Sequence, residues 1–254
     1  MLWLSLSLGA AFFMATCAAY IKRFFTDVPA WEMGLIPALY ASPYCLAALP
    51  FVGVPPIGPD FFSTIAWLLP LFAVSLLLHY RAIRLSPLSL TMPFLSFTPV
   101  FVLLTGDLLL GERIGTGGVI GILLVVTGGY VLNLDSARDG LLGPVRAIFR
   151  EPGSALMLLV AAIYSLTSVG GKVLILQSSP LFAALVLFAA VGPLLGIVLW
   201  AAGKVSLRIV FQRPLLGLGA GLLVFGDLVC HNLAISMVSA AYMVALKRMA
   251  GIFS

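Results

Sequence analysis

The feature that most constrains this chain is a series of apolar runs, each about as long as a helix that crosses a lipid bilayer. Such a helix requires about 20 apolar residues. Only 9% of the residues are charged, against about 25% in a soluble domain, so most of the surface must face lipid. The sequence therefore predicts an all-α polytopic membrane protein. The predicted spans are 2–21, 33–53, 61–79, 88–109, 115–133, 154–175, 181–202 and 215–236, with a ninth beginning near Ala240.

Composition argues against several functions. The cysteines Cys17, Cys45 and Cys230 lie far apart inside apolar runs, so neither a disulfide framework, a metal site nor a cofactor is predicted. The net charge of +5 comes without a basic stripe carrying interleaved aromatics, which argues against nucleic acid. No zinc-protease motif, nucleophile elbow or P-loop occurs, so no enzyme is predicted. The expected partners are membrane lipid and a small-molecule substrate, with a homodimer as a further possibility.

The chain also repeats itself at an offset of about 152 residues. The segment 79–84 aligns with 231–236 and shares its His, Ala and Ile, and Lys22 matches Lys172 at an offset of 150. Each copy would hold five spans. Because five is odd, the second copy would enter the membrane from the opposite side, as in the inverted repeats of secondary transporters. The predicted units are a first repeat at 1–134, a connecting loop at 135–152, and a second repeat at 153–254 that the same offset would extend to near position 286.

Several motifs resemble those of a known family. The run LSPLSLTMP at 85–93, the Gly111-Glu112 pair and the run GVIGIL at 118–123 resemble the EamA repeat of the drug/metabolite transporter superfamily. The segment 245–254 resembles the start of the ninth span in that family. The resemblance implies a ten-helix inverted repeat, here incomplete after the start of helix 9. It also implies an exporter of metabolites, amino acids or drugs, working by alternating access in the cell (inner) membrane.

An incomplete second repeat also favours a different class, a truncated or regulatory membrane component that does not transport. Polar residues near the middle of the predicted spans argue against that alternative. Both readings are kept as hypotheses, and a membrane-embedded enzyme ranks behind them.

Prolines and a Gly-Glu pair mark the fourth predicted span. Pro87, Pro93 and Pro99 each remove a backbone donor, so this span is expected to be kinked and to face the protein interior. Gly111 and Glu112 follow it. We expect Glu112 to cap the N-terminus of the next helix, where the helix dipole favours an anion. A role in ligand binding is the alternative.

A polar stripe occurs at matching places in both repeats. Asp227 lies near the middle of the eighth span, and His231 follows one turn later on the same face. Their repeat mates are Ser75 and His79. One hypothesis is that the stripe lines a central cavity and handles a proton or a substrate cation. The alternative is that Asp227 pairs with a neighbouring base and holds two helices together.

Two adjacent cations, Lys247 and Arg248, are expected to enter the ninth span. Neighbouring residues on a helix point about 100° apart, so both cannot face one partner. One could neutralise Asp227 while the other attracts an anionic group of the substrate; snorkelling to the membrane surface is the alternative. Snorkelling is the expectation for Lys22 and Lys172, which end the first span of each repeat.

Small residues and charges give two further expectations. The pairs Gly117/Gly121, Gly192/Gly196 and Gly217/Gly221 are spaced for close helix packing. With a cytoplasmic N-terminus, the cytoplasmic loops would hold only Arg113, and the opposite loops would hold every other loop cation. The positive-inside rule therefore predicts an external N-terminus, whereas the family resemblance implies the reverse.

Overall fold

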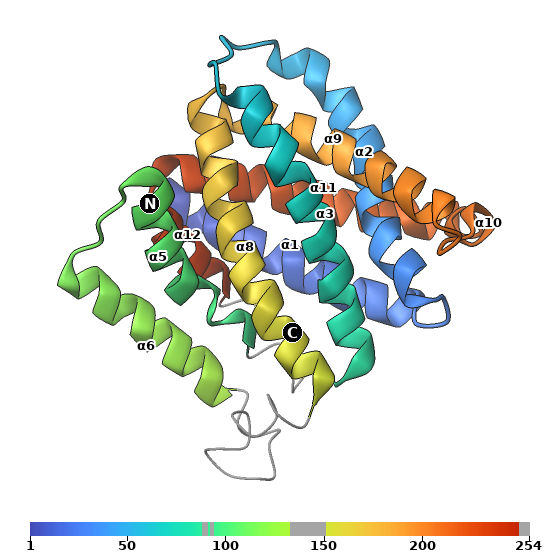
Figure 1. Cartoon of the computed structure of the whole chain (residues 1–254), viewed down its shortest axis with the longest axis horizontal. Helices are drawn as coiled ribbons and strands as arrows, with labels where there is room; N and C mark the ends of the chain where they lie inside the picture. The colour runs from blue at the N-terminus through green and yellow to red at the C-terminus, as the bar shows by residue number, and fades with distance from the viewer. Residues whose placement is uncertain (88–90, 92–93, 133–150, 249–254) are drawn as a thin grey trace.

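The computed structural model describes residues 1–87, 91, 94–132 and 151–248, and every regular element in these ranges is a helix (Figure 1). Six helices are long and apolar enough to cross a membrane, which confirms the polytopic prediction. They are α1 (Leu2–Phe24), α2 (Ala30–Val52), α3 (Phe61–Leu85), α8 (Pro152–Leu176), α9 (Pro180–Ala201) and α11 (Pro214–Met237). The shorter described helices are α5 (Thr98–Leu110), α6 (Thr116–Leu132), α10 (Leu207–Val210) and α12 (Ala240–Lys247).

The starts of three long helices follow from proline. Pro152, Pro180 and Pro214 occupy the first turns of α8, α9 and α11. The backbone N–H groups in the first turn of a helix form no hydrogen bonds within the helix, so a proline there removes none. Ser179 adds a side-chain cap to α9 by accepting a hydrogen bond from the Phe182 backbone nitrogen at 3.4 Å.

The fourth predicted span is broken, as its prolines indicated. Helical residues end at Leu95, a turn follows at Ser96 and Phe97, and α5 begins at Thr98 with Pro99 in its first turn. Leu95 and Thr98 are buried, so this region faces the protein interior. Residues 88–90 and 92–93, including Pro93, lie outside the described residues, as do 133–150 and 249–254.

The main helix contacts join the two halves of the chain. α2 packs along α9, α1 along α11, and α3 along α8. If α1 corresponds to α8 and α3 to α11, the last two contacts are equivalent. This pairing is the one expected of two related halves, and it supports an inverted repeat. The repeat boundaries remain a prediction.

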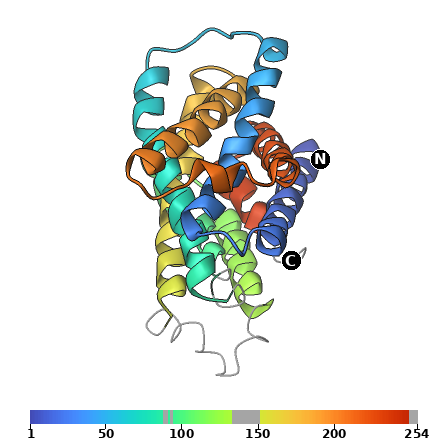
Figure 2. The same cartoon turned by 90° about the vertical axis from the view of Figure 1, so that its right-hand side faces the viewer.

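The loops that connect the helices gather at two opposite ends of the bundle, as Figures 1 and 2 show. At one end, Arg84 Nη1 donates to the Val28 carbonyl at 2.7 Å, and Arg213 pairs with Asp27 at 2.6 Å. At the other end, the Gly58 nitrogen donates to the Gln177 carbonyl at 2.8 Å.

The hydrogen bonds from Arg213 lower the pKa of the Asp27 carboxyl. That pair is therefore formed at neutral pH and is lost as the pH falls through this lowered pKa.

Glycines let α9 and α11 approach the backbone of α2. A Cβ added at Gly192 would lie 2.4 Å from the Ala38 carbonyl oxygen, and one at Gly221 would lie 2.2 Å from that of Tyr40. Gly217 likewise faces the Tyr40 ring. The packing prediction is therefore confirmed for these glycines. It is wrong for the pair Gly117/Gly121, where nothing lies within 4 Å of the added Cβ, because both residues are on the exposed side of α6.

Replacing Gly221 by Ala should destabilise the fold by about 1–3 kcal/mol, because the new methyl group must push α11 away from the α2 backbone. Gly121→Ala is the matched control, since it adds the same methyl group to a helix at an open position. Thermal unfolding in detergent micelles measures the difference. Equal midpoints for the two variants would show that the contact between α2 and α11 is looser than described.

Candidate functional site

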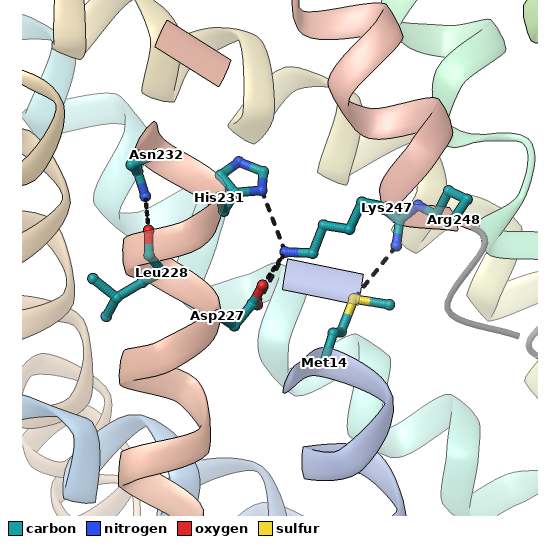
Figure 3. Close-up of polar contacts among 7 residues, drawn as sticks. All are labelled: Met14, Asp227, Leu228, His231, Asn232, Lys247 and Arg248. Atoms are coloured by element: carbon teal, nitrogen blue, oxygen red, sulfur yellow. Dashed lines mark hydrogen bonds and ion pairs between the residues drawn. The ribbon is translucent and has the colours of Figure 1, made fainter. Parts of the chain in front are cut away.

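An ion pair joins α11 and α12 in the interior of the bundle. Lys247 Nζ lies 2.7 Å and 2.9 Å from the two carboxylate oxygens of Asp227, and 3.3 Å from His231 Nδ1 (Figure 3). Asp227 and His231 point to the same side of α11 because they are one turn apart. An ammonium group only donates hydrogen bonds, so His231 Nδ1 accepts. The imidazole is therefore neutral and carries its proton on Nε2.

The pair is largely shielded by helices from both halves. The side chain of Lys247 is 11% exposed and that of Asp227 is 23% exposed. α12 packs on α1 and α5 as well as on α11. On the opposite side of α11, Asn232 donates to the Leu228 carbonyl at 2.8 Å and turns away from the pair (Figure 3). The ion pair with Lys247 is the contact expected if Asp227 pairs with a neighbouring base and holds two helices together. Proton transfer through Asp227 remains a prediction.

Arg248 points away from the ion pair, as the 100° spacing of adjacent residues required. Its Nη1 lies 3.9 Å from Met14 Sδ (Figure 3), and its guanidinium carbon lies 5.5 Å from the centre of the Tyr164 ring. Its Nε is buried and has no hydrogen-bond partner among the described residues. No carboxylate in the described part of the chain forms an ion pair with Arg248. Of the two cations, only Lys247 neutralises Asp227.

The repeat mates of Asp227 and His231 behave differently from each other. The ring of His79 lies 5.7 Å from that of Tyr164, so His79 joins Arg248 around the same aromatic side chain. Its Nδ1 is buried and has no partner within the described ranges. Ser75 is fully buried but donates to the Phe72 carbonyl of its own helix at 2.7 Å. Sequence reasoning missed Tyr164, since no pattern separates it from other aromatic residues of α8.

A second polar junction lies at the end of the bundle opposite the basic loops. Glu112 accepts a hydrogen bond from Lys172, and its Oε2 accepts one from the Ala240 backbone nitrogen at 3.0 Å. Lys172 Nζ also donates to the Val238 carbonyl at 2.7 Å. Gly111, with a φ of 65°, permits the turn that follows α5.

This junction corrects two expectations from the sequence. Glu112 caps the N-terminus of α12 and not that of the next helix in the chain, α6. Lys172 does not snorkel, because its ammonium group is held by Glu112 and Val238. In both cases the loop after α5 lies across α8 and α12, which the sequence did not reveal. Lys22, the repeat mate of Lys172, is exposed, as snorkelling requires.

Replacing Glu112 by Gln should lower stability by about 2 kcal/mol, because Lys172 loses its counter-charge in a site where both side chains are mostly buried. Asp107→Asn is the control. Asp107 and Glu112 both line a groove of about 350 Å³, and Asp107 pairs with Arg113 at 3.7 Å, but the side chains of Asp107 and Arg113 are exposed. Thermal unfolding of the purified variants compares them. A midpoint for Glu112→Gln no lower than that for Asp107→Asn would contradict the junction.

One further buried acid escaped the sequence analysis. Glu32 lies in the first turn of α2, is 3% exposed, and accepts a hydrogen bond from the Ser206 backbone nitrogen at 3.0 Å. It was missed because the predicted second span began at residue 33. Among the described residues, no three His, Cys, Asp or Glu side chains gather as metal ligands would.

The long apolar helices, with charges buried among them, define a polytopic membrane protein. The sequence profile of the EamA-like transporter family matches residues 1–134, more than half of the chain. The chain belongs to this family, and hence to the drug/metabolite transporter superfamily. A solved structure described as "Crystal structure of protein" is similar over 99% of this chain and 85% of its own, with a TM-score of 0.73 and 16% identity, which shows the fold alone. No curated protein matches the chain.

Proposed function

We propose that the protein is a secondary transporter that exports small organic solutes by alternating access. The observation that carries this proposal is the Asp227–Lys247 pair, which joins two helices of the second half where α12 packs on α1 and α5 of the first half, and which contacts the neutral His231. Charged residues inside a membrane are costly and usually mark a pathway for an ion or a solute. The family supports transport in general, while export and the choice of solute belong to the proposal.

In this mechanism two helix bundles rock against each other around the ion pair. The moving units would each combine helices of both halves: α1 would move with α11, and α3 with α8, because these pairs are in extensive contact. Asp227 would exchange a proton as the site opens to one side and then the other. The alternative, a membrane component that does not transport, gives the buried charges no task beyond joining α11 to α12.

The charges of the loops suggest how the protein is inserted. Among the described loops, cations gather at the end that holds Arg84 and Arg213, so we place that end in the cytoplasm of the cell (inner) membrane and the N-terminus outside. Cysteine labelling of a Ser136→Cys variant in intact cells tests this placement. Slow labelling by an impermeant reagent is expected, and rapid labelling would reverse the orientation.

The function is tested with the purified full chain in liposomes. A pH difference is imposed across the membrane, and the movement of labelled metabolites, amino acids and drugs is followed. Transport of at least one solute above protein-free liposomes, driven by the pH difference, is expected. A folded protein that moves none of them would support the alternative of a membrane component without transport activity.

A further inference from the structure

We infer that the transported solute is a small organic anion whose carboxylate binds at Arg248, beside His79 and Tyr164. The inference rests on the proposed function and names its substrate class. It comes from two buried nitrogen atoms that have no hydrogen-bond partner among the described residues, Arg248 Nε and His79 Nδ1, and from the net charge of the side chains around them.

The first group is the guanidinium of Arg248. A buried cation is normally paired with an anion, because removing it from water costs free energy that only a counter-charge offsets. Lys247 has such a partner in Asp227, whereas among the described residues Arg248 contacts the Met14 sulfur and the Tyr164 ring and no carboxylate pairs with it. Its planar array of donors matches the two oxygens of a carboxylate. A carboxylate would also give the buried Nε of Arg248 the partner that it lacks.

The second group is the imidazole of His79, which reaches the same place from α3. His79 is 9% exposed, and its Nδ1 has no partner among the described residues. The Tyr164 ring lies 5.7 Å from the ring of His79 and 5.5 Å from the guanidinium carbon of Arg248, so both side chains flank one aromatic residue. A neutral imidazole with its proton on Nδ1 can donate a hydrogen bond to an anionic oxygen. His79 and Arg248 belong to different halves, so a ligand bound by both would bridge them.

The third argument is the net charge of the cluster. Asp227 carries one negative charge, and Lys247 and Arg248 carry one positive charge each, while His231 is neutral. One positive charge therefore remains among the described side chains. A monoanion would neutralise it, an uncharged solute would leave it, and a cation would double it. A zwitterion would bring an ammonium group, for which Asp227 is already occupied by Lys247. The site therefore favours a solute with a net negative charge.

Three probes of equal length test this preference: hexanoate, hexanamide and hexylammonium. Their affinities for the purified full chain are measured by calorimetry in micelles. Hexanoate should bind at least about tenfold more tightly than either of the other two, because only hexanoate forms charge-assisted hydrogen bonds with Arg248. Arg248→Gln should remove this advantage, Arg248→Lys should retain part of it, and His79→Gln should weaken it. Arg113→Gln is the control, since Arg113 is exposed and pairs with Asp107.

The wild-type protein alone can overturn the inference, whether or not the variants fold. Equal affinities for hexanoate and hexanamide, or a preference for hexylammonium, would reject the anion site, as would unchanged hexanoate binding by a folded Arg248→Gln variant. Transport in liposomes separates this failure from that of the proposed function. Movement of neutral or cationic solutes alone would retain the transporter and reject the anion. Binding of hexanoate without movement of any solute would retain the anion site and reject the transporter.

Discussion

Replacing Lys247 by Met should lower the free energy of unfolding by about 3 kcal/mol, because it leaves the Asp227 carboxylate among apolar helices without a counter-charge. Methionine fills nearly the volume of the lysine stem, so the change removes the charge and little packing. His231 is neutral in the wild-type protein, so it could supply a positive charge only by taking up a proton. Denaturant titration of the purified variant in micelles measures the effect.

The matched control is Lys22→Met, which removes an equivalent charge from an exposed position at the end of α1. It should change stability by less than about 0.5 kcal/mol. Adding Asp227→Leu to Lys247→Met should recover most of the loss, because the unpaired carboxylate is then removed. If Lys247→Met were as stable as Lys22→Met, the ion pair would contribute nothing to the fold.

Replacing both members of the pair, Asp227→Asn with Lys247→Gln, should leave the protein folded and reduce transport to that of protein-free liposomes. The two amides can still hydrogen-bond, and neither is charged, so the packing of α11 on α12 is retained. Neither amide can exchange a proton near neutral pH. Asp227→Asn by itself is less suitable as a test, because the single change leaves Lys247 without its anion.

The sequence anticipated features that depend on local patterns. The six long spanning helices follow from runs of apolar residues, and the break before α5 follows from prolines that cannot continue a helix. The shared face of Asp227 and His231 follows from their spacing of one turn. The sequence also raised the possibility that one of the two cations of the ninth span neutralises Asp227, and their spacing required that they point apart. The structure assigned the pairing to Lys247.

Other contacts were not predictable because they join distant parts of the chain. Glu112 and Lys172 are 60 residues apart, and Glu32 and Ser206 are 174 apart. A single sequence shows that such residues are polar but not which helix ends meet. For this reason Glu112 was assigned to the wrong helix. Tyr164 was missed because its importance comes from the side chains around it.

The central claim is that the Asp227–Lys247 pair takes part in transport and does not only join two helices. The most direct test is the transport rate of the double variant, Asp227→Asn with Lys247→Gln, in liposomes over a range of pH, with its folding verified by thermal unfolding. The account predicts a folded protein with no transport above background at any pH. Transport at the wild-type rate, with the wild-type dependence on pH, would contradict it and leave the pair a purely structural contact.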